Sequence, residues 1–396
     1  MSLALLAAML PAVSTHAEGR SDYARYQQQL GFQPLDRQNT PDVRSSTAPG
    51  LLPQGFTATK LISAGDPTAS GQPLPGEGDM ITLDPGERYL FTVHETKTNA
   101  ALTRLDLQTG VAEVIAQNPA WSRMDPVKWT PWGTLVIGEE YAGGRIYEVH
   151  PWTGEYWSRD SLGTFAHEGI AFGPDGSVYL GDENGDGAIY KFVPASYGNL
   201  REGTLYALKD GEGWIRIENP AMAAAEAKAK GATLFNRPED MEVGPDGNVY
   251  VTVTATHQVL RFAPGDRPQV QVFVQGGPVG QNDFNWPDNL AFDTKGNLYI
   301  AEDIPDNEKL QYQQQDDIWV ALPDQNGDGK SDGIFRFASL STSQGAAYGA
   351  QNEPTGIYFN RDGSRLYLNQ QHADNPLWVI TGFDRENQGE RMKSVR

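Results

Sequence analysis

One phrase of hydrophobic and polar positions recurs along the chain. A short apolar run is followed by a turn with glycine and then by a second run rich in Tyr, Val, Leu and Ile. Asp-Gly between alternating hydrophobic positions is a strong signal for a β-hairpin. The pattern therefore predicts six hairpins: two looser copies at 79–93 and 126–140, and closer copies at 169–183, 240–254, 289–303 and 356–370.

The spacing of these hairpins indicates a propeller. The gaps between their turn glycines are 47, 43, 71, 49 and 67 residues, counted between Gly86, Gly133, Gly176, Gly247, Gly296 and Gly363. A period of about 40 to 50 residues suits one four-stranded blade, and a longer gap suits a blade with an insertion. We expect an all-β fold, a six-bladed β-propeller over residues 51–396 with loop and short-helix insertions. One helix is expected over 220–230 (PAMAAAEAKAK), and the polar insertion at 304–333 reads as a loop.

The N-terminus has a different composition from the repeats. Residues 1–17 contain an apolar run from Leu3 to Leu10 followed by small residues, which predicts a signal peptide and export to the periplasm or the outside. That run is too short to span a bilayer. Residues 18–50 are polar and read as a leader or linker.

The charge balance excludes several classes of partner. The chain has 31 Lys and Arg against 51 Asp and Glu, a formal net charge of −20. Such a protein repels nucleic acid and anionic membranes, so we expect a small-molecule substrate and a monomer. The chain has no cysteine, which excludes disulfides, zinc–thiolate sites and a cysteine nucleophile.

Aligning the six hairpins brings acidic residues to equivalent positions. At the start of the first strands the aligned residues are Asp79 (after Gly78), Asp125, Glu168, Glu239, Asp288 and Thr355. At the ends of the second strands they include His94 with Glu95, Glu139 with Glu140, Asp182 with Glu183, and Glu302 with Asp303. First strands line the channel of a propeller, so these carboxylates are expected to converge and to need cations or protons. Calcium, magnesium or oxidised iron fit such oxygen ligands.

A second candidate metal site lies in one loop. Asp324, Asn326 and Asp328 stand at positions 1, 3 and 5 of an EF-hand-like pattern, with Gly329 at position 6 and Asp332 at position 9. Position 12 is Phe335, where a bidentate Glu belongs. A calcium loop and a tight polar turn are both open interpretations.

Several segments, in order along the chain, resemble the secreted PhoX-type alkaline phosphatases. They are VHET (93–96), KWTPWGTLVIGEE (128–140), FAHEGIAF (165–172), YLGDENGDGAIYKFV (179–193), NLREGTLYALK (199–209), NRPEDMEV (236–243), WPDNLAFDTKGNLYI (286–300) and EPTGIYFNRDGSRLYLNQQH (353–372). The resemblance implies a six-bladed propeller with a central cluster of iron and calcium that hydrolyses phosphate monoesters. It implies metal-ligand roles for Glu139, Glu140, Glu168, Glu239 and Asp288, and more loosely for Asp79, Glu95, His94 and Glu353. It also implies that Arg237 contacts the substrate phosphate.

One position departs from that family. The resemblance implies an iron-binding cysteine before the paired acids, where this chain has Gly138. Calcium without iron therefore stays open as the cofactor. Two other functions also stay open: a calcium-dependent lactonase-like hydrolase with Glu168, Asp288 and Asn289 as ligands, and a non-enzymatic binding propeller stabilised by metal.

Overall fold

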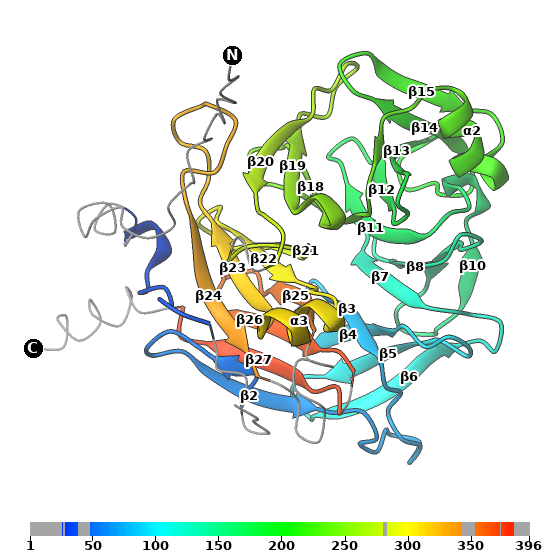
Figure 1. Ribbon diagram of the computed structural model, residues 1–396. Helices are drawn as coiled ribbons and strands as arrows, with labels where there is room; N and C mark the ends of the chain where they lie inside the picture. Colours follow the sequence, from blue (N-terminus) through cyan, green and yellow to red (C-terminus); the bar gives the residue numbers. More distant parts are fainter. Residues whose placement is uncertain are drawn as a thin grey trace, which may run out of the picture.

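Six antiparallel sheets follow one another around a closed circle (Figure 1). The computed structural model describes residues 26, 28–38, 48–279, 283–341, 353–372 and 374–383. The architecture confirms the predicted all-β, six-bladed propeller. The predicted signal peptide lies outside the described residues. No helix among the described residues is long and apolar enough to cross a membrane.

The first three sheets are each continuous in the sequence. The first consists of β3 (Gly78–Leu83), β4 (Tyr89–His94), β5 (Ala101–Asp106) and β6 (Val111–Gln117). The second consists of β7 (Met124–Trp129), β8 (Leu135–Glu139), β9 (Ile146–Val149) and β10 (Tyr156–Ser158). The third consists of β11 (His167–Phe172), β12 (Val178–Asp182), β13 (Gly187–Pro194), β14 (Gly203–Lys209) and β15 (Gly213–Ile217), with β16 (Leu234–Phe235) paired to β13.

The last two sheets each borrow a strand from the N-terminal part of the chain. The fourth sheet is continuous: β17 (Pro238–Val243), β18 (Val249–Val253), β19 (Gln258–Phe262) and β20 (Gln271–Gln275). The fifth consists of β21 (Pro287–Phe292), β22 (Leu298–Glu302), β23 (Asp317–Ala321) and β24 (Ile334–Leu340), with β1 (Gly50–Leu51) at its edge. The sixth consists of β25 (Pro354–Phe359), β26 (Arg365–Gln370) and β27 (Leu377–Thr381), with β2 (Thr57–Ile62) as its outermost strand. Pairing of β2 with β27 joins the two ends of the propeller and closes the circle.

The first strand of every blade faces the axis. β3, β7, β11, β17, β21 and β25 each contact the first strand of the next blade, and β25 returns to contact β3. The core lies between neighbouring sheets. Between the first two sheets, for example, Phe91 and Leu102 pack with Val127 and Ile137. Stacking of twisted sheets around an axis thus buries both faces of each blade and leaves only the starts of the first strands open to the channel.

The described part of the expected linker packs on the propeller. Leu30 and Phe32 are buried in the core cluster of the fifth and sixth blades. The Phe32 ring makes edge-to-face contacts with Phe56 and Phe337, at centroid distances of 5.5 and 5.3 Å. Residues 28–38 are therefore part of the folded domain, contrary to the linker expected over 18–50.

The insertions are more ordered than the sequence indicated. The expected helix over 220–230 forms as the 3-10 turn η2 (Pro220–Met222) and the helix α2 (Ala223–Ala229), on the outer side of the third sheet (Figure 1). Two further 3-10 turns, η1 (Asp160–Leu162) and η3 (Thr254–Thr256), lie in loops. The prediction of a loop over 304–333 is wrong in part, because this segment contains the helix α3 (Asp306–Tyr312) and the blade strand β23.

Candidate metal centre

A bulge at the start of each first strand turns its side chains toward the channel. In the third blade, His167 pairs with Asp182 but Ile170 pairs with Leu180, so three residues of β11 oppose two of β12. A register shift of the same size occurs in all six blades, and in the sixth it begins one residue later, after the pair Thr355 and Asn369. A bulge inserts one residue and re-aims the side chains beside it. The residues placed here, which we call the first ring, are Asp79, Asp125, Glu168, Glu239, Asp288 and Thr355.

A second ring of residues comes from the ends of the second strands. On each second strand, one residue is paired with the residue just before the first-ring position, and the residue after it belongs to the second ring. His94, Glu139, Asp182, Val253, Glu302 and Gln370 oppose the residue before each first-ring position. The next residues form the second ring: Glu95, Glu140, Glu183, Thr254, Asp303 and Gln371. Members of both rings line a cavity of about 150 Å³, with ten carboxylates in its wall. Nine belong to the two rings, and the tenth is Glu353.

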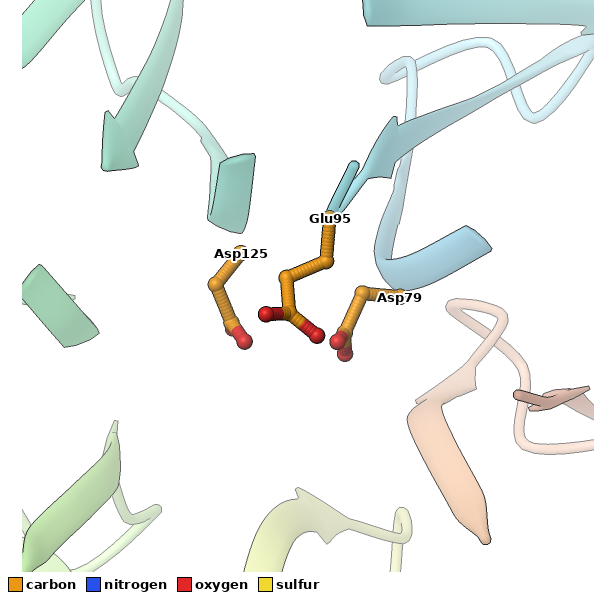
Figure 2. A group of neighbouring side chains, drawn as sticks. All are labelled: Asp79, Glu95 and Asp125. Carbon is orange, nitrogen blue, oxygen red and sulfur yellow. The ribbon is translucent and has the colours of Figure 1, made fainter. Parts of the chain in front are cut away.

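The carboxylates approach one another closely. Oxygens of Asp79, Glu95 and Asp125 lie within 4.8 Å of one another, and Figure 2 shows the three side chains, from different elements, pointing to one place. A second group, Asp125, Glu140 and Glu168, meets the same limit. Asp125 is common to both groups, so it would help to hold a cation in either of them.

Burial makes the ionised forms of these groups costly. Burial raises the pKa of Asp125 and Glu168 well above the ordinary range, and neighbouring carboxylates raise them further. The pKa of Glu140 rises to about 12, first through burial and then through Glu183 and Glu95. Carboxyl groups this close cannot all ionise without counter-charge.

The residues present fit bound cations. Asp125 Oδ1 and Glu168 Oε2 are buried and have no hydrogen-bond partner among the described residues. Unpaired buried carboxylate oxygens are costly unless a cation or proton meets them. Apart from Arg237 and His372, the wall offers oxygen ligands, the donor set that calcium, magnesium and oxidised iron prefer.

Arg237 lies at the edge of the cavity and is held by three acids. Its Nε donates to Glu183 at 2.7 Å, and one terminal nitrogen lies 2.6 Å from Glu239 and 3.7 Å from Asp303. The side chain remains 31% exposed. The Arg237 charge lowers the pKa of Glu183, against the effect of burial and together with a hydrogen bond from Glu140. Arg237 thus joins two second-ring acids to one first-ring acid.

His372 is a second cation beside the cavity. Its Nδ1 lies 2.6 Å from Glu77 and its Nε2 lies 3.3 Å from Glu353. Burial opposes the charged form, but the two carboxylates raise the His372 pKa to about 11. His372 is therefore an imidazolium bridging two acids.

Further along the first strands, charged side chains close the channel. Lys128 pairs with Glu242 from β17, and its Nζ lies 3.6 Å from Asp240. Lys128 lies three positions after Asp125, and Glu242 lies three positions after Glu239. These ion pairs link the second blade to the fourth.

Glu139, a predicted ligand, lies outside the cavity. Glu139 Oε1 accepts a hydrogen bond from the Ser122 amide at 3.0 Å, and Oε2 accepts from the Arg145 amide and the Tyr147 hydroxyl, both at 3.3 Å. Glu302 occupies the same position in the fifth blade and likewise accepts from two backbone amides. These glutamates fasten strand ends, contrary to the ligand role expected of Glu139. Of the other ligands that the resemblance implies, all but His94 line the cavity: Asp79, Glu95, Glu140, Glu168, Glu239, Asp288 and Glu353.

Gly138 and His94 also lie away from the cavity. A Cβ at Gly138 would meet His167 Cβ at 2.8 Å and Pro126 Cγ at 2.9 Å, so a side chain there would point between blades. A cysteine at 138 would not face the cavity, and its absence removes no ligand from it. The His94 ring is buried between the Gly76 carbonyl, at 3.0 Å, and the Thr103 hydroxyl, at 2.9 Å. Burial lowers the His94 pKa to about 4, which marks a neutral structural imidazole.

The loop from Asp324 to Asp332 is stabilised without a cation. Asp324 accepts hydrogen bonds from the Gly327 and Gly329 amides at 2.7 and 2.9 Å, and Arg261 pairs with it at 2.7 Å. Asn326 Nδ2 donates to Asp332 at 2.9 Å, and the Asp328 amide donates to Asn326 at 2.9 Å. Calcium binding in this loop remains a prediction.

Two second-ring residues and one rim residue carry contacts that the repeat alignment did not assign. Gln371 donates to Asp79 at 2.8 Å and to Glu95 at 3.0 Å, which ties the sixth blade to the first. Asp303 approaches Arg237, and His372 bridges Glu77 and Glu353. The alignment had listed Asp303 without a partner, and a strict count of one residue past the paired strand position would also have found Gln371. No pattern pointed to the His372 bridge.

The fold and this wall of acids define a class: six-bladed propellers with a carboxylate-lined central site suited to metal. Within it, the chain belongs to the alkaline phosphatase PhoX family, whose sequence model matches residues 143–374. The chain is similar to the structure of PhoX from Pseudomonas fluorescens in complex with vanadate, a transition-state analogue. There the TM-score is 0.67 at 19% identity, over 88% of this chain and 98% of the other.

Other similarities are weaker. A gluconolactonase from Xanthomonas campestris gives a TM-score of 0.52 at 12% identity over 88% of this chain and 97% of that one, which shows a shared fold. Peptidyl-alpha-hydroxyglycine alpha-amidating lyase 1 of Drosophila melanogaster is 26% identical over 124 residues. That match covers 31% of this chain and 21% of the lyase, so the chain spans about a fifth of that protein's length.

Proposed function

We propose that this protein is a metal-dependent phosphomonoesterase. The observation that carries the proposal is the cavity itself: ten carboxylates and Arg237 line about 150 Å³ at the axis of a propeller of the PhoX family. Cations are the proposed cofactors, with calcium first and iron as the alternative. The proposed substrate is a small phosphate ester, and we propose export as its setting because PhoX family members are secreted.

The first- and second-ring carboxylates would hold the cations. Asp125 is the central ligand, since it belongs to both close groups, with Asp79 and Glu95 on one side and Glu140 and Glu168 on the other. When bound, such cations would neutralise the phosphoryl oxygens and lower the pKa of an attacking water. They would also replace the protons that Glu140 and its neighbours hold in the metal-free protein.

Arg237 would bind and orient the phosphate. A guanidinium presents a planar fork that matches phosphate oxygens in a bidentate way. Glu183 fixes Nε of this fork, and Glu239 and Asp303 hold one terminal nitrogen. Cations that draw on these carboxylates would free donors of Arg237 for the substrate.

The negative charge of the protein favours substrate binding only when metal is bound. A protein of net charge −20 repels an anionic ester, and ten carboxylates at the site strengthen that repulsion. Bound cations offset the local charge, so activity is expected only with metal present.

The lactonase alternative has less support in the geometry. It requires Asn289 as a ligand beside Glu168 and Asp288. Asn289 Oδ1 already accepts hydrogen bonds from the Gly356 amide at 2.6 Å and the Thr355 hydroxyl at 2.7 Å. The Thr355 hydroxyl hydrogen is shared with Asp79, but the Gly356 amide already engages this oxygen and ties Asn289 to the sixth blade.

Phosphate release from 4-nitrophenyl phosphate tests the proposal. Chelation should abolish release, and calcium, iron or both should restore it. Asp125→Asn should remove most activity, whereas Asp160→Asn, a carboxylate 68% exposed outside the cavity, should leave it unchanged. Lactone hydrolysis without phosphate release would favour the lactonase. No turnover of either substrate by metal-loaded protein would favour a binding propeller.

A further inference from the structure

A third ring of residues lies two positions before the first ring in every blade. The amide of each second-ring residue donates to the carbonyl of a third-ring residue, at 2.7 to 3.0 Å in all six blades. The third-ring residues are Glu77, Arg123, Ala166, Arg237, Trp286 and Glu353. Five of the six are partly exposed, whereas the first ring is buried, so the third ring lies toward the opening of the cavity.

Four members of this ring share an unusual backbone. Glu77, Arg123, Arg237 and Trp286 have φ values of 52°, 48°, 59° and 44°. This left-handed region costs free energy for residues other than glycine and is kept where surrounding contacts enforce it. The same amide–carbonyl bond holds each of the four residues in an equivalent place in its blade. The side chains of these four residues therefore start from equivalent places around the opening of the cavity.

The third ring has an acidic side and a basic side. Glu353 of the sixth blade and Glu77 of the first blade both pair with His372. Arg123 of the second blade and Arg237 of the fourth stand on either side of the third blade, whose third-ring residue is Ala166. Ala166 carries only a methyl group, so the third ring places no charged side chain between the two arginines.

The two arginines differ in their contacts. Arg237 is engaged by Glu183, Glu239 and Asp303. Arg123 is partly buried, yet its guanidinium makes no ion pair with any residue in the described part of the chain. Its backbone is fully used, because the amide donates to Thr96 and the carbonyl accepts from Glu140, both at 2.8 Å. Through its carbonyl, Arg123 is one hydrogen bond away from the cavity residue Glu140. In a chain with 20 more acids than bases, an arginine without an ion pair at this place has its donors available for an anion.

We propose that Arg123 is a second phosphate-binding residue, acting across Ala166 from Arg237. The inference rests on the proposed phosphomonoesterase function and adds a specific recognition group to it. The phosphate group of an ester would enter on the basic side of the third ring, away from Glu77 and Glu353. Arg123 would contribute to binding without competition from carboxylates.

Competitive inhibition by inorganic phosphate, measured on the metal-loaded full-length protein, tests the inference. Arg123→Gln should raise the phosphate inhibition constant and the KM for 4-nitrophenyl phosphate by about ten- to a hundredfold, the usual worth of a charged hydrogen bond. Arg123→Lys should recover part of the loss, because it keeps the charge without the fork. Arg216→Gln is the matched control, since Arg216 is 62% exposed and pairs with Glu218 on the outer sheet edge.

The outcomes separate the two proposals. If the wild-type protein hydrolyses the ester and Arg123→Gln keeps the wild-type inhibition constant and KM, the role of Arg123 is overturned while the function stands. If the loaded wild-type protein neither binds phosphate in calorimetry nor hydrolyses the ester, the proposed function fails and the inference with it. The thermal unfolding midpoints of all variants should match the wild type, which excludes misfolding as the cause of a loss.

Discussion

Glu139 and Glu140 are adjacent in the sequence but lie on different sides of the strand end. Glu140 lines the cavity, and Glu139 fastens the Ser122 and Arg145 amides. Glu140→Gln should therefore lower the bound metal content and the activity at least tenfold, with little loss of stability. Glu139→Gln should keep the metal content and lower the free energy of unfolding by about 1 to 2 kcal/mol, because it disturbs a buried acceptor. Elemental analysis and urea denaturation of both variants check this, and a loss of metal in Glu139→Gln would contradict the assignment.

Gly138 offers a second test at the same strand end. Because a Cβ there would meet Pro126 and His167 below 3.0 Å, Gly138→Cys should overpack the space between blades. A loss of about 1 to 3 kcal/mol in the free energy of unfolding is expected, without new metal binding. Elemental analysis that found additional iron in Gly138→Cys would show that the position does face the metals.

The repeat placed the first-ring acids correctly because equivalent residues of a propeller share one orientation toward the axis. It could not separate Glu139 from Glu140, since side chains alternate along a strand and one residue changes the face. The bulges that set this register have no clear signature in the sequence. Contacts between distant loops, such as that of His372 with Glu77, depend on how blades meet and were not predictable from any one blade.

At the scale of elements, residues 28–38 act as a packed strap. Phe32 is 6% exposed between Phe56 and Phe337. Phe32→Ala should cost about 3 kcal/mol by emptying this site. The exposed neighbour Gln28 offers the control, and Gln28→Ala should have little effect. Urea denaturation would contradict the packed strap if Phe32→Ala unfolded at the wild-type midpoint.

The blade elements were predicted best where their pattern was strongest. Six hairpins with Asp-Gly or related turns, and the helix over 220–230, were all found from local signals. The strand β23 was missed because its apolar core, Ile318 to Ala321, is short and flanked by polar residues and a proline. The strap was missed because it has only two fully buried apolar residues, Leu30 and Phe32, in a mostly polar segment.

At the scale of the whole molecule, the carboxylates link stability to pH and metal. The pKa values of Asp125, Glu168 and Glu140 are raised in the folded protein, the last to about 12, so the native state binds more protons than the unfolded one. The contribution of these carboxyl groups to the free energy of unfolding is greatest below their pKa values in the unfolded chain, near 4. It is lost as the pH rises toward their pKa values in the folded protein. The melting temperature of metal-stripped protein should therefore fall between about pH 5 and about pH 9, and added calcium should flatten the fall.

Asp125→Asn sharpens that prediction. Removing one of the repelling carboxylates should raise the melting temperature of stripped protein at about pH 9 and weaken the stabilisation by calcium. Differential scanning calorimetry of both proteins, with and without calcium, measures this. A stripped wild-type protein whose stability does not fall with pH, or an Asp125→Asn protein stabilised by calcium as strongly as the wild type, would contradict a carboxylate-bound metal centre.

The central claim is that metal held by the two carboxylate rings supports phosphate-ester hydrolysis. The most direct measurement follows the rate of 4-nitrophenyl phosphate hydrolysis while stripped protein is titrated with calcium and iron, with bound metal counted at each point. The account predicts that the rate rises in proportion to bound metal in the wild type and stays near zero in Glu168→Gln. A fully loaded wild-type protein that releases no phosphate would contradict it.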